Sequence, residues 1–272
     1  MIASTLIKNV DIVFLDQILS GDILIKDGKI AKIAASLSDN AEVILNESGL
    51  TLFAGNIDTH VHFRDPGATY KEDINSGSIA AASGGVTTFF DMPNTNPSTT
   101  TIEALEAKKE YAKCNSIVNY NFFIGATHDN LNHLKQAQNI PGIKIYVGSS
   151  TGELLVDNKT ELEQIFSQTK HTIAVHSEDE QMIQERLQTY KGSSDVIDHE
   201  KIRSAEGALK CTKMLIELAQ KTNHHLHICH LTTKQEVDLL RGLGTQSLIT
   251  SEVSPQHLLT YAPNVYDKWG TK

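Results

Sequence analysis

The stretch that decides the fold reads Asn56-Ile57-Asp58-Thr59-His60-Val61-His62, and Phe63-Arg64-Asp65-Pro66-Gly67 follows it. An apolar run that ends in Asp-Pro-Gly predicts a short strand that breaks into a loop. Alternate residues of a strand point to the same side, so His60 and His62 can reach one metal ion. The alternative is a pair of strand-end histidines bonded to backbone or water. A His-x-His pair alone does not decide between the two.

Two later apolar runs also end in histidine. They are Thr172–His176 and His224–His230, and the second is followed by a stretch that looks like a helix start. Alternation places His230 on the same side of its strand as Leu226 and Ile228. Histidines at three strand ends, on one edge of a parallel sheet, predict a metal site at that edge.

From residue 54 onward, short apolar runs alternate with helix-like stretches, which is typical of a parallel sheet. We predict strands over Asn56–His60, Thr87–Asp91, Val118–Ile124, Gly142–Val147, Thr172–His176, His225–His230 and Ser247–Glu252. We predict helices over Ser76–Ser83, Ile102–Cys114, Asn130–Ala137, Lys159–Gln168, Ala205–Lys221 and Thr233–Arg241. Seven strands fit an open doubly wound sheet, whereas a (β/α)8 barrel fits the metal site better but needs one more unit. Gln188–Lys201, rich in Gly, Ser and Asp, is predicted to be a long loop.

Residues 1–53 have a different pattern, that of short strands. Asp22–Ala34 has alternating apolar residues on both sides of Asp27-Gly28, and Asp-Gly between such runs is a strong hairpin signal. A segment of this size is too small to fold alone with a large core. We therefore predict a small β module over residues 1–53 and a larger domain over residues 54–272.

The composition excludes several classes of protein. The 272 residues include 24 Lys plus Arg and 33 Asp plus Glu, for a net charge of −9, so nucleic acid and anionic membranes are not expected partners. No apolar run approaches the roughly 20 residues that cross a bilayer. The N-terminus lacks the regions of a signal peptide. The three cysteines are too few for a disulfide framework, so we expect a cytoplasmic protein.

One charged residue lies inside an apolar strand. Lys144 interrupts the run Gly142–Val147, and a buried ammonium is costly unless it is paired or modified. Lys144 therefore faces a carboxylate, leans out to solvent, or carries a modification. The residues alone do not choose among these.

Two long motifs resemble the signatures of dihydroorotases of the amidohydrolase superfamily. The first is Asp58–Asp73 and the second is Ala80–Pro97. Shorter matches follow in the order of the family at Gly142–Ser150, Val175–Glu178, His199–Glu206 and Ile228–Thr233. The resemblance runs from about residue 5 to the last residue.

The resemblance implies an α/β fold, a (β/α)8 TIM-like amidohydrolase barrel with a small N-terminal β-sandwich module. It implies two zinc ions held by His60, His62, Lys144, His176 and His230, with Lys144 carboxylated so that its carbamate bridges the ions. It implies the reversible cyclisation of N-carbamoyl-L-aspartate to L-dihydroorotate in pyrimidine biosynthesis. Arg64 and Asn94 match the positions that grip the carboxylate of this small substrate. Arginine offers carboxylates a bidentate fork, and asparagine offers a donor and an acceptor.

Within the superfamily, Arg64 favours one reaction. Allantoinases and hydantoinases share the metal residues but lack this arginine, so Arg64 together with Met92–Thr95 favours a dihydroorotase. Gln256 stands where the family commonly has a second histidine.

Family members also continue beyond the position of Lys272, with an eighth strand, a catalytic aspartate and closing strands of the sandwich. We therefore expect an incomplete barrel and assign no catalytic residue. We expect the chain alone to be weakly active or inactive.

A second class of function is a non-catalytic homologue that serves as a binding or assembly partner. The complete set of metal residues favours the enzyme over this alternative. An incomplete barrel leaves two outer strands with unpaired edges, which invite pairing with other chains. A homo-oligomer is therefore also considered.

Overall fold

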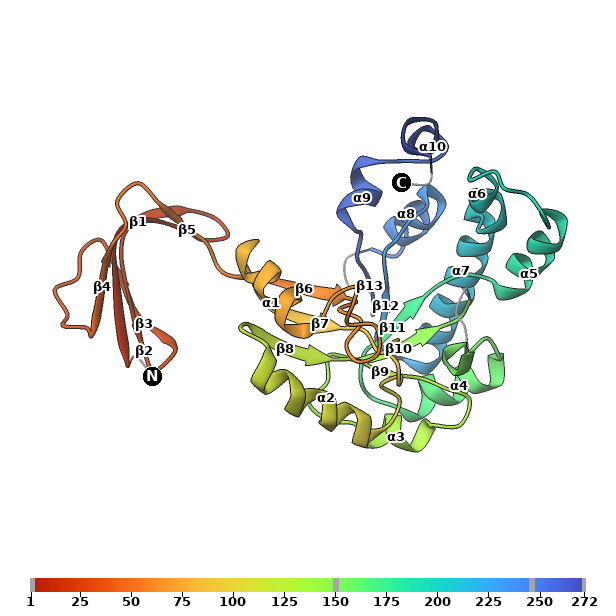
Figure 1. The fold of residues 1–272 in the computed structure, drawn as a ribbon, viewed down its shortest axis with the longest axis horizontal. Helices are drawn as coiled ribbons and strands as arrows, with labels where there is room; N and C mark the ends of the chain where they lie inside the picture. The colour runs from red at the N-terminus through yellow and green to blue at the C-terminus, as the bar shows by residue number, and fades with distance from the viewer. Residues whose placement is uncertain (1–2, 149–151, 245–247, 271–272) are drawn as a thin grey trace. The chain divides into compact units, whose positions relative to one another are not determined.

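The computed structural model describes residues 3–148, 152–244 and 248–270. The chain divides into two compact units, Met1–Asn56 and Ile57–Lys272 (Figure 1), whereas the sequence predicts a boundary after residue 53. Within the described residues, no helix is long and apolar enough to cross a membrane.

The smaller unit is built on one five-stranded sheet. Its strands are β1 (Ser4–Val13), β2 (Ile18–Lys26), β3 (Lys29–Ala34), β4 (Val43–Asn46) and β5 (Thr51–Leu52), in the order β3-β2-β1-β4 with β5 paired to β1. The predicted hairpin is confirmed, because β2 and β3 are antiparallel and Asp27 and Gly28 form the turn with φ values of 49° and 72°. Two positive φ values are what a type I′ turn requires. A sandwich consists of two sheets that face each other. The described part of this unit forms a single sheet.

A buried carboxylate organises the loops of this unit. Asp22, on β2, accepts the backbone N–H of Asn9 at 2.9 Å and that of Leu37 at 2.8 Å. The ammonium of Lys8 lies 3.8 Å from its second oxygen. Asn9 has a φ of 60° and lies where the register between β1 and β2 shifts. Asp22 therefore satisfies an amide that the irregular strand leaves without a sheet partner.

The larger unit contains strands at all seven predicted positions. They are β6 (Asn56–Val61), β7 (Val86–Asp91), β8 (Asn119–Phe122), β9 (Ile124–Gly125), β10 (Ile143–Tyr146), β11 (Ile173–His176), β12 (Leu226–Ile228) and β13 (Ile249–Ser251). The predicted strand Val118–Ile124 is divided at Phe123 into β8 and β9. Ser247, the predicted start of the last strand, lies outside the described residues, as do Ser149 and Ser150 of the motif at Gly142–Ser150.

These strands form two sheets that follow one another. Their orders are β6-β7-β8 and β9-β10-β11-β12-β13, and the pairs β7–β8, β9–β10, β10–β11, β11–β12 and β12–β13 are parallel. Because β8 and β9 are consecutive parts of one segment, the two sheets meet at Phe123. The strands β6 and β13 stand at the two ends of this series. The described chain therefore forms parallel α/β sheets without a closed ring of strands.

Helices lie at all six predicted positions. They are α1 (Ile74–Ser83), α2 (Ile102–Asn115), α3 (Leu131–Gln136), α4 (Lys159–Gln168), α7 (Ala205–Thr222) and α8 (Lys234–Arg241). The sequence analysis missed the 3₁₀ helix η1 (Gly152–Leu154), α5 (Glu180–Thr189), α6 (Asp198–Ile202), α9 (Pro255–Leu259) and α10 (Asn264–Trp269). The predicted loop Gln188–Lys201 is wrong at both ends, because α5 continues to Thr189 and α6 begins at Asp198. Asp179 is the N-cap of α5, because its side chain accepts the backbone N–H of Met182 at 2.9 Å. The sequence analysis missed this helix because most of its residues are polar.

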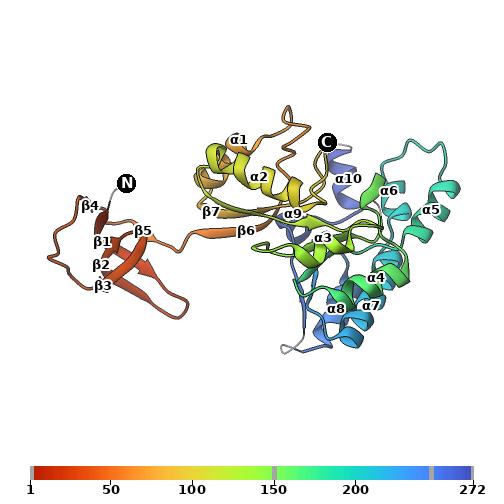
Figure 2. The same cartoon turned by 90° about the horizontal axis from the view of Figure 1, so that it is seen from below.

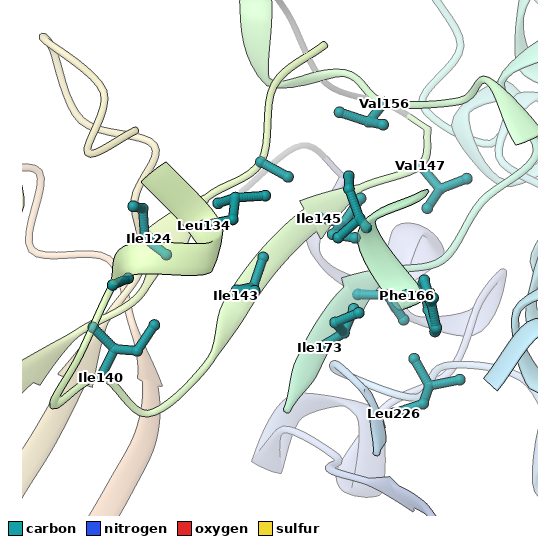
Figure 3. Packing of buried hydrophobic residues seen from close by; sticks show 14 of the residues in the cluster. Ile124, Leu134, Ile140, Ile143, Ile145, Val147, Val156, Phe166, Ile173 and Leu226 are labelled. Carbon is teal, nitrogen blue, oxygen red and sulfur yellow. The ribbon is translucent and has the colours of Figure 1, made fainter. Parts of the chain in front are cut away.

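The side chains of β10 show how each strand divides the unit into two faces. Ile143 and Ile145 pack in the hydrophobic core with Phe166 of α4 (Figure 3). Lys144 and Tyr146 point to the opposite face and are also buried. Helices α4 and α7 lie against one another (Figures 1 and 2). Both supply side chains to the core. Alternation thus sends one set of residues toward the helices and the other set toward the inner face.

Candidate metal centre

The first two histidines of the candidate centre lie at the end of β6. Nε2 of His60 and Nε2 of His62 are 3.1 Å apart. Two nitrogens on one tetrahedral zinc ion lie roughly 3.3 Å apart, because each Zn–N bond is about 2.0–2.1 Å long. Each ring binds a protein oxygen with its other nitrogen: Nδ1 of His62 lies 2.7 Å from Oδ1 of Asn94, and Nδ1 of His60 contacts a carboxylate oxygen of Glu252. The two Nε2 nitrogens therefore face one another closely enough to share one ion.

A second pair of histidines lies beside the first. Nδ1 of His176, at the end of β11, lies 3.0 Å from Nε2 of His230. Strict alternation would place His230 with Leu226 and Ile228, which face the hydrophobic core. That prediction is wrong, because His230 has a φ of 36° and its ring instead lies 5.4 Å from the ring of His60. The backbone turn after β12 thus brings all four imidazoles together.

Lys144 lies close to all four histidines, and its charge acts to lower the pKa of each ring. The residue is 1% exposed, so it does not lean out to solvent. Its Nζ lies 3.1 Å from Sγ of Cys229 and 5.0 Å from the ring centre of Tyr146. Within residues 3–148, 152–244 and 248–270, no carboxylate forms an ion pair with this ammonium. Among the described residues, Lys144 is thus a buried lysine without a carboxylate partner.

Burial keeps two of the imidazoles neutral. It lowers the pKa of His62 to about 3, with the charge of His60 as the next cause, and it lowers the pKa of His230 to about 3, with Lys144 as the next cause. His60 differs, because burial lowers its pKa but hydrogen bonds to Cys229 and Glu252 outweigh this effect and raise the pKa to about 9. Metal ions bind the neutral form of imidazole. An ion at His60 therefore has to displace a proton.

A carboxylate also holds the ring of His176. Oε2 of Glu178 lies 2.6 Å from Nε2 of His176, and Nε of Arg203 lies 3.0 Å from the other oxygen of Glu178. Burial raises the pKa of Glu178, but hydrogen bonds from His176 and Arg203 lower it to about 2. Sequence reasoning missed the roles of four residues in the centre: Glu178, Arg203, Cys229 and Glu252. Three of them lie within two residues of a motif histidine or a predicted strand end, which was the available signal.

Arg64 and Asn94 border the first histidine pair. Arg64 has a φ of 61°, which is uncommon for a residue other than glycine. Its charge contributes to the low pKa of His62, so the guanidinium lies near that ring. In the part of the chain that the structure describes, no carboxylate pairs with Arg64. The side-chain oxygen of Asn94 accepts a hydrogen bond from His62, and its Nδ2 amide is a hydrogen-bond donor.

A cavity opens beside the second histidine pair. Its volume is about 710 Å³, and its walls include His176, His230, Arg203 and Thr233. Helices α9 and α10 contribute His257 and Tyr266 to its lining. The cavity is large enough for a small organic molecule and reaches the second histidine pair, whereas His60, His62, Arg64 and Asn94 are not among its lining residues.

Comparison with known proteins places these features in a family. The family model described as dihydro-orotase-like matches residues 49–236. A dihydroorotase from Methanosarcina acetivorans is 36% identical and the match covers 94% of this chain and 57% of that protein. An allantoinase from Bacillus velezensis is 33% identical over 88% of this chain and 55% of its own length.

Solved structures of cyclic amide hydrolases have the same fold. The L-hydantoinase (dihydropyrimidinase) of Arthrobacter aurescens superposes with a TM-score of 0.90 at 27% identity, over 98% of this chain and 61% of that one. A D-hydantoinase superposes with a TM-score of 0.83 at 29% identity, over 60% of its length. The chain therefore spans a little more than half the length of the proteins it matches.

Proposed function

The chain belongs to the dihydro-orotase-like family, and from that premise we propose that it is a zinc-dependent cyclic amide hydrolase of the dihydroorotase type. The proposed reaction is the reversible cyclisation of N-carbamoyl-L-aspartate to L-dihydroorotate. One observation carries the proposal: four imidazoles from β6, β11 and the turn after β12 converge around a buried, carboxylate-free lysine.

The residues of the centre fit two zinc ions. His60 and His62 would hold one ion, and His176 and His230 would hold the other. Lys144 would supply an anionic ligand as a carbamate, which forms when its neutral amine adds carbon dioxide and loses one proton. The anion replaces a buried cation and balances part of the metal charge. When bound, zinc supplies Lewis acidity that polarises the amide carbonyl and activates water at neutral pH.

Arg64 and Asn94 bind the carboxylate of the substrate in this proposal. The unpaired guanidinium of Arg64 provides two parallel donors, and the Nδ2 amide of Asn94 provides a third. Because Asn94 also accepts from His62, the grip on the substrate and the orientation of a metal ligand share one side chain. The chain's own part in the reaction is thus to bind, orient and polarise, and no proton carrier is assigned.

We also propose that the larger unit is part of an amidohydrolase barrel. The seven strand positions correspond to seven units of an amidohydrolase (β/α)8 barrel, and β6 and β13 lie at the two ends of the series. The five-stranded sheet of Met1–Asn56 corresponds to one part of a small β-sandwich.

A second candidate is a hydantoinase or allantoinase, because both kinds of protein are among the relatives described above. They would use the same metal residues. The arginine at position 64 favours the dihydroorotase, since a substrate carboxylate gives the guanidinium a partner.

The test measures metal and ligand binding on the purified chain. We expect close to two zinc ions per chain after dialysis, and loss of the first ion in the double variant with His60→Ala and His62→Ala. Calorimetry should then detect L-dihydroorotate but neither hydantoin nor allantoin, and Arg64→Lys should weaken that binding at least tenfold. Equal zinc in the wild type and the double variant would contradict the proposal.

A further inference from the structure

Glu252 makes side-chain contacts with residues that lie 192 and 193 positions earlier in the chain. It follows β13, and its backbone is fixed against β12 by two hydrogen bonds, from Glu252 N–H to the carbonyl of Ile228 at 3.1 Å and from Leu231 N–H to the carbonyl of Glu252 at 2.8 Å. The side chain is only 19% exposed. Its carboxylate is therefore held over the inner face.

Both oxygens of this carboxylate accept hydrogen bonds. One oxygen contacts Nδ1 of His60 and lies 3.4 Å from the backbone nitrogen of His230. The other lies 3.2 Å from Oγ1 of Thr59 and 3.3 Å from Nε2 of His227. The donors come from β6 on one side and from β12 and its turn on the other. A single side chain thus links the first and the last strand regions of the larger unit.

We propose that Glu252 is a positioning residue for the metal centre, which holds His60 with Nε2 as the free ligand nitrogen and fastens β6 to β13. The inference rests on the proposed metal site. A carboxylate is only an acceptor, so Nδ1 of His60 must carry the hydrogen, and the lone pair then lies on Nε2. That nitrogen is the one 3.1 Å from Nε2 of His62. Carboxylates commonly hold the second nitrogen of a metal-ligating histidine in this way.

The competing explanation is that Glu252 is itself a ligand. His60, Cys229 and Glu252 offer three possible ligand atoms within 4.8 Å of one another. An ion bound between Glu252 and Nδ1 of His60 would lie on the opposite side of the ring from His62. Such an ion would not use the two Nε2 atoms that lie close together. The hydrogen bond between Asn94 and His62 would then orient His62 without a metal ion to bind. The geometry therefore favours Glu252 as the partner of a ligand.

The two explanations differ in measurable ways. In the positioning role, Glu252→Gln keeps the number of bound ions and weakens zinc binding by roughly 10- to 100-fold, the usual effect of removing such a partner. The imidazole nitrogen spectrum of the zinc-loaded chain should show His60 with hydrogen on Nδ1 and metal on Nε2, and the Nδ1 signal should move in Glu252→Gln. Glu185→Gln, an exposed glutamate on α5, is the matched control and should change neither readout.

Cobalt substitution separates the alternatives further. A sulfur-to-cobalt charge-transfer band together with loss of one whole ion in Glu252→Gln would show ligation by Cys229 and Glu252, and would overturn the inference. Unchanged zinc affinity and an unchanged Nδ1 signal would also overturn it, while leaving the proposed function intact if the wild type still binds two ions. A wild-type chain without zinc would reject the proposed function itself. If Glu252→Gln does not fold, Thr59→Val and His227→Gln remove the other donors singly, and each should leave the His60 signal in place.

Discussion

The ammonium group of Lys144 is buried among groups that do not neutralise its charge. The ammonium lies next to a thiol, an aromatic ring and four imidazoles, and it is 1% exposed. Burying an isolated ammonium costs several kcal/mol. A carbamate removes that cost, because it replaces the cation with an anion that metal ions neutralise. The burial of Lys144 thus supports the carbamate that the proposed function assigns to it.

Replacing Lys144 tests this argument directly. Lys144→Ala should reduce the bound zinc from two ions to one or fewer, because the bridging anion is lost. Added acetate or propionate should restore the second ion, and metal analysis measures both states. The exposed Lys135→Ala is the control. Two retained ions in Lys144→Ala without any added acid would exclude the bridge.

Replacing Tyr146 is predicted to stabilise the protein. Its hydroxyl is buried and has no hydrogen-bond partner among the described residues, and such a group costs roughly 1–3 kcal/mol. Tyr146→Phe should therefore raise the free energy of unfolding of the metal-free chain by about 1 kcal/mol. Tyr120→Phe is the matched control, because the Tyr120 hydroxyl donates to the carbonyl of Lys109 at 3.2 Å. Urea titration of both variants decides, and a destabilised Tyr146→Phe would mean that the hydroxyl has a partner.

At the level of single residues, the sequence predicts the histidines of the candidate centre. It does not predict the residues that form hydrogen bonds with their rings. His60, His62 and His176 follow from strand ends, because alternation holds up to the last residue of a strand. His230 reaches the cluster only through a positive φ, which the sequence does not reveal at a non-glycine residue. Glu252 is assigned its role by a contact with a residue 192 positions away. Contacts of that range have no local signature.

Among the elements, the hairpin unit depends on one acidic side chain. Burial alone would raise the pKa of Asp22, but hydrogen bonds from the backbone of Leu37 and Asn9, together with the charge of Lys8, lower it below its usual value. A carboxyl with a depressed pKa in the folded state stabilises the fold above its unfolded pKa of about 3.9. That contribution is lost as the pH falls through the lower, folded pKa.

Asp22→Asn should therefore remove a stabilisation that the wild type has near neutral pH. We expect a loss of about 1–2 kcal/mol at pH 7, and a smaller difference between the two proteins as the pH falls below about 4. Hydrogen exchange of the Asn9 and Leu37 amides measures the local effect. Asp11→Asn, an exposed change on β1, is the control. A difference that grows on acidification would have the wrong sign for this explanation.

The elements themselves were predictable where the pattern was strong. Short apolar runs indicated each strand position, and α7 has a clear apolar face. The break at Phe123 was not predictable, because an uninterrupted apolar run carries no sign of a change of sheet partner. Helix α5 was missed since only Ile183 of its residues is buried, which leaves little periodicity to detect.

For the molecule as a whole, the end strands β6 and β13 determine how the chain is expected to associate. They stand at the ends of the strand series, and edge strands can bind other chains. We expect self-association that increases with protein concentration, measured by sedimentation velocity. A charge on the edge strand should oppose it, so Ile57→Lys should shift the population toward monomer, while Ile79→Lys on the surface of α1 should not. A concentration-independent monomer in the wild type would contradict the expectation.

The contact between His60 and Glu252 also has a consequence for the order of folding. It joins residues 192 positions apart, and closing so long a loop is entropically costly until the intervening strands have paired. In the proposed function, we expect the site of the first ion to be completed late in folding. Interactions made after the main barrier to folding slow unfolding more than they speed folding. Zinc should therefore act on this chain chiefly by extending the lifetime of the native state.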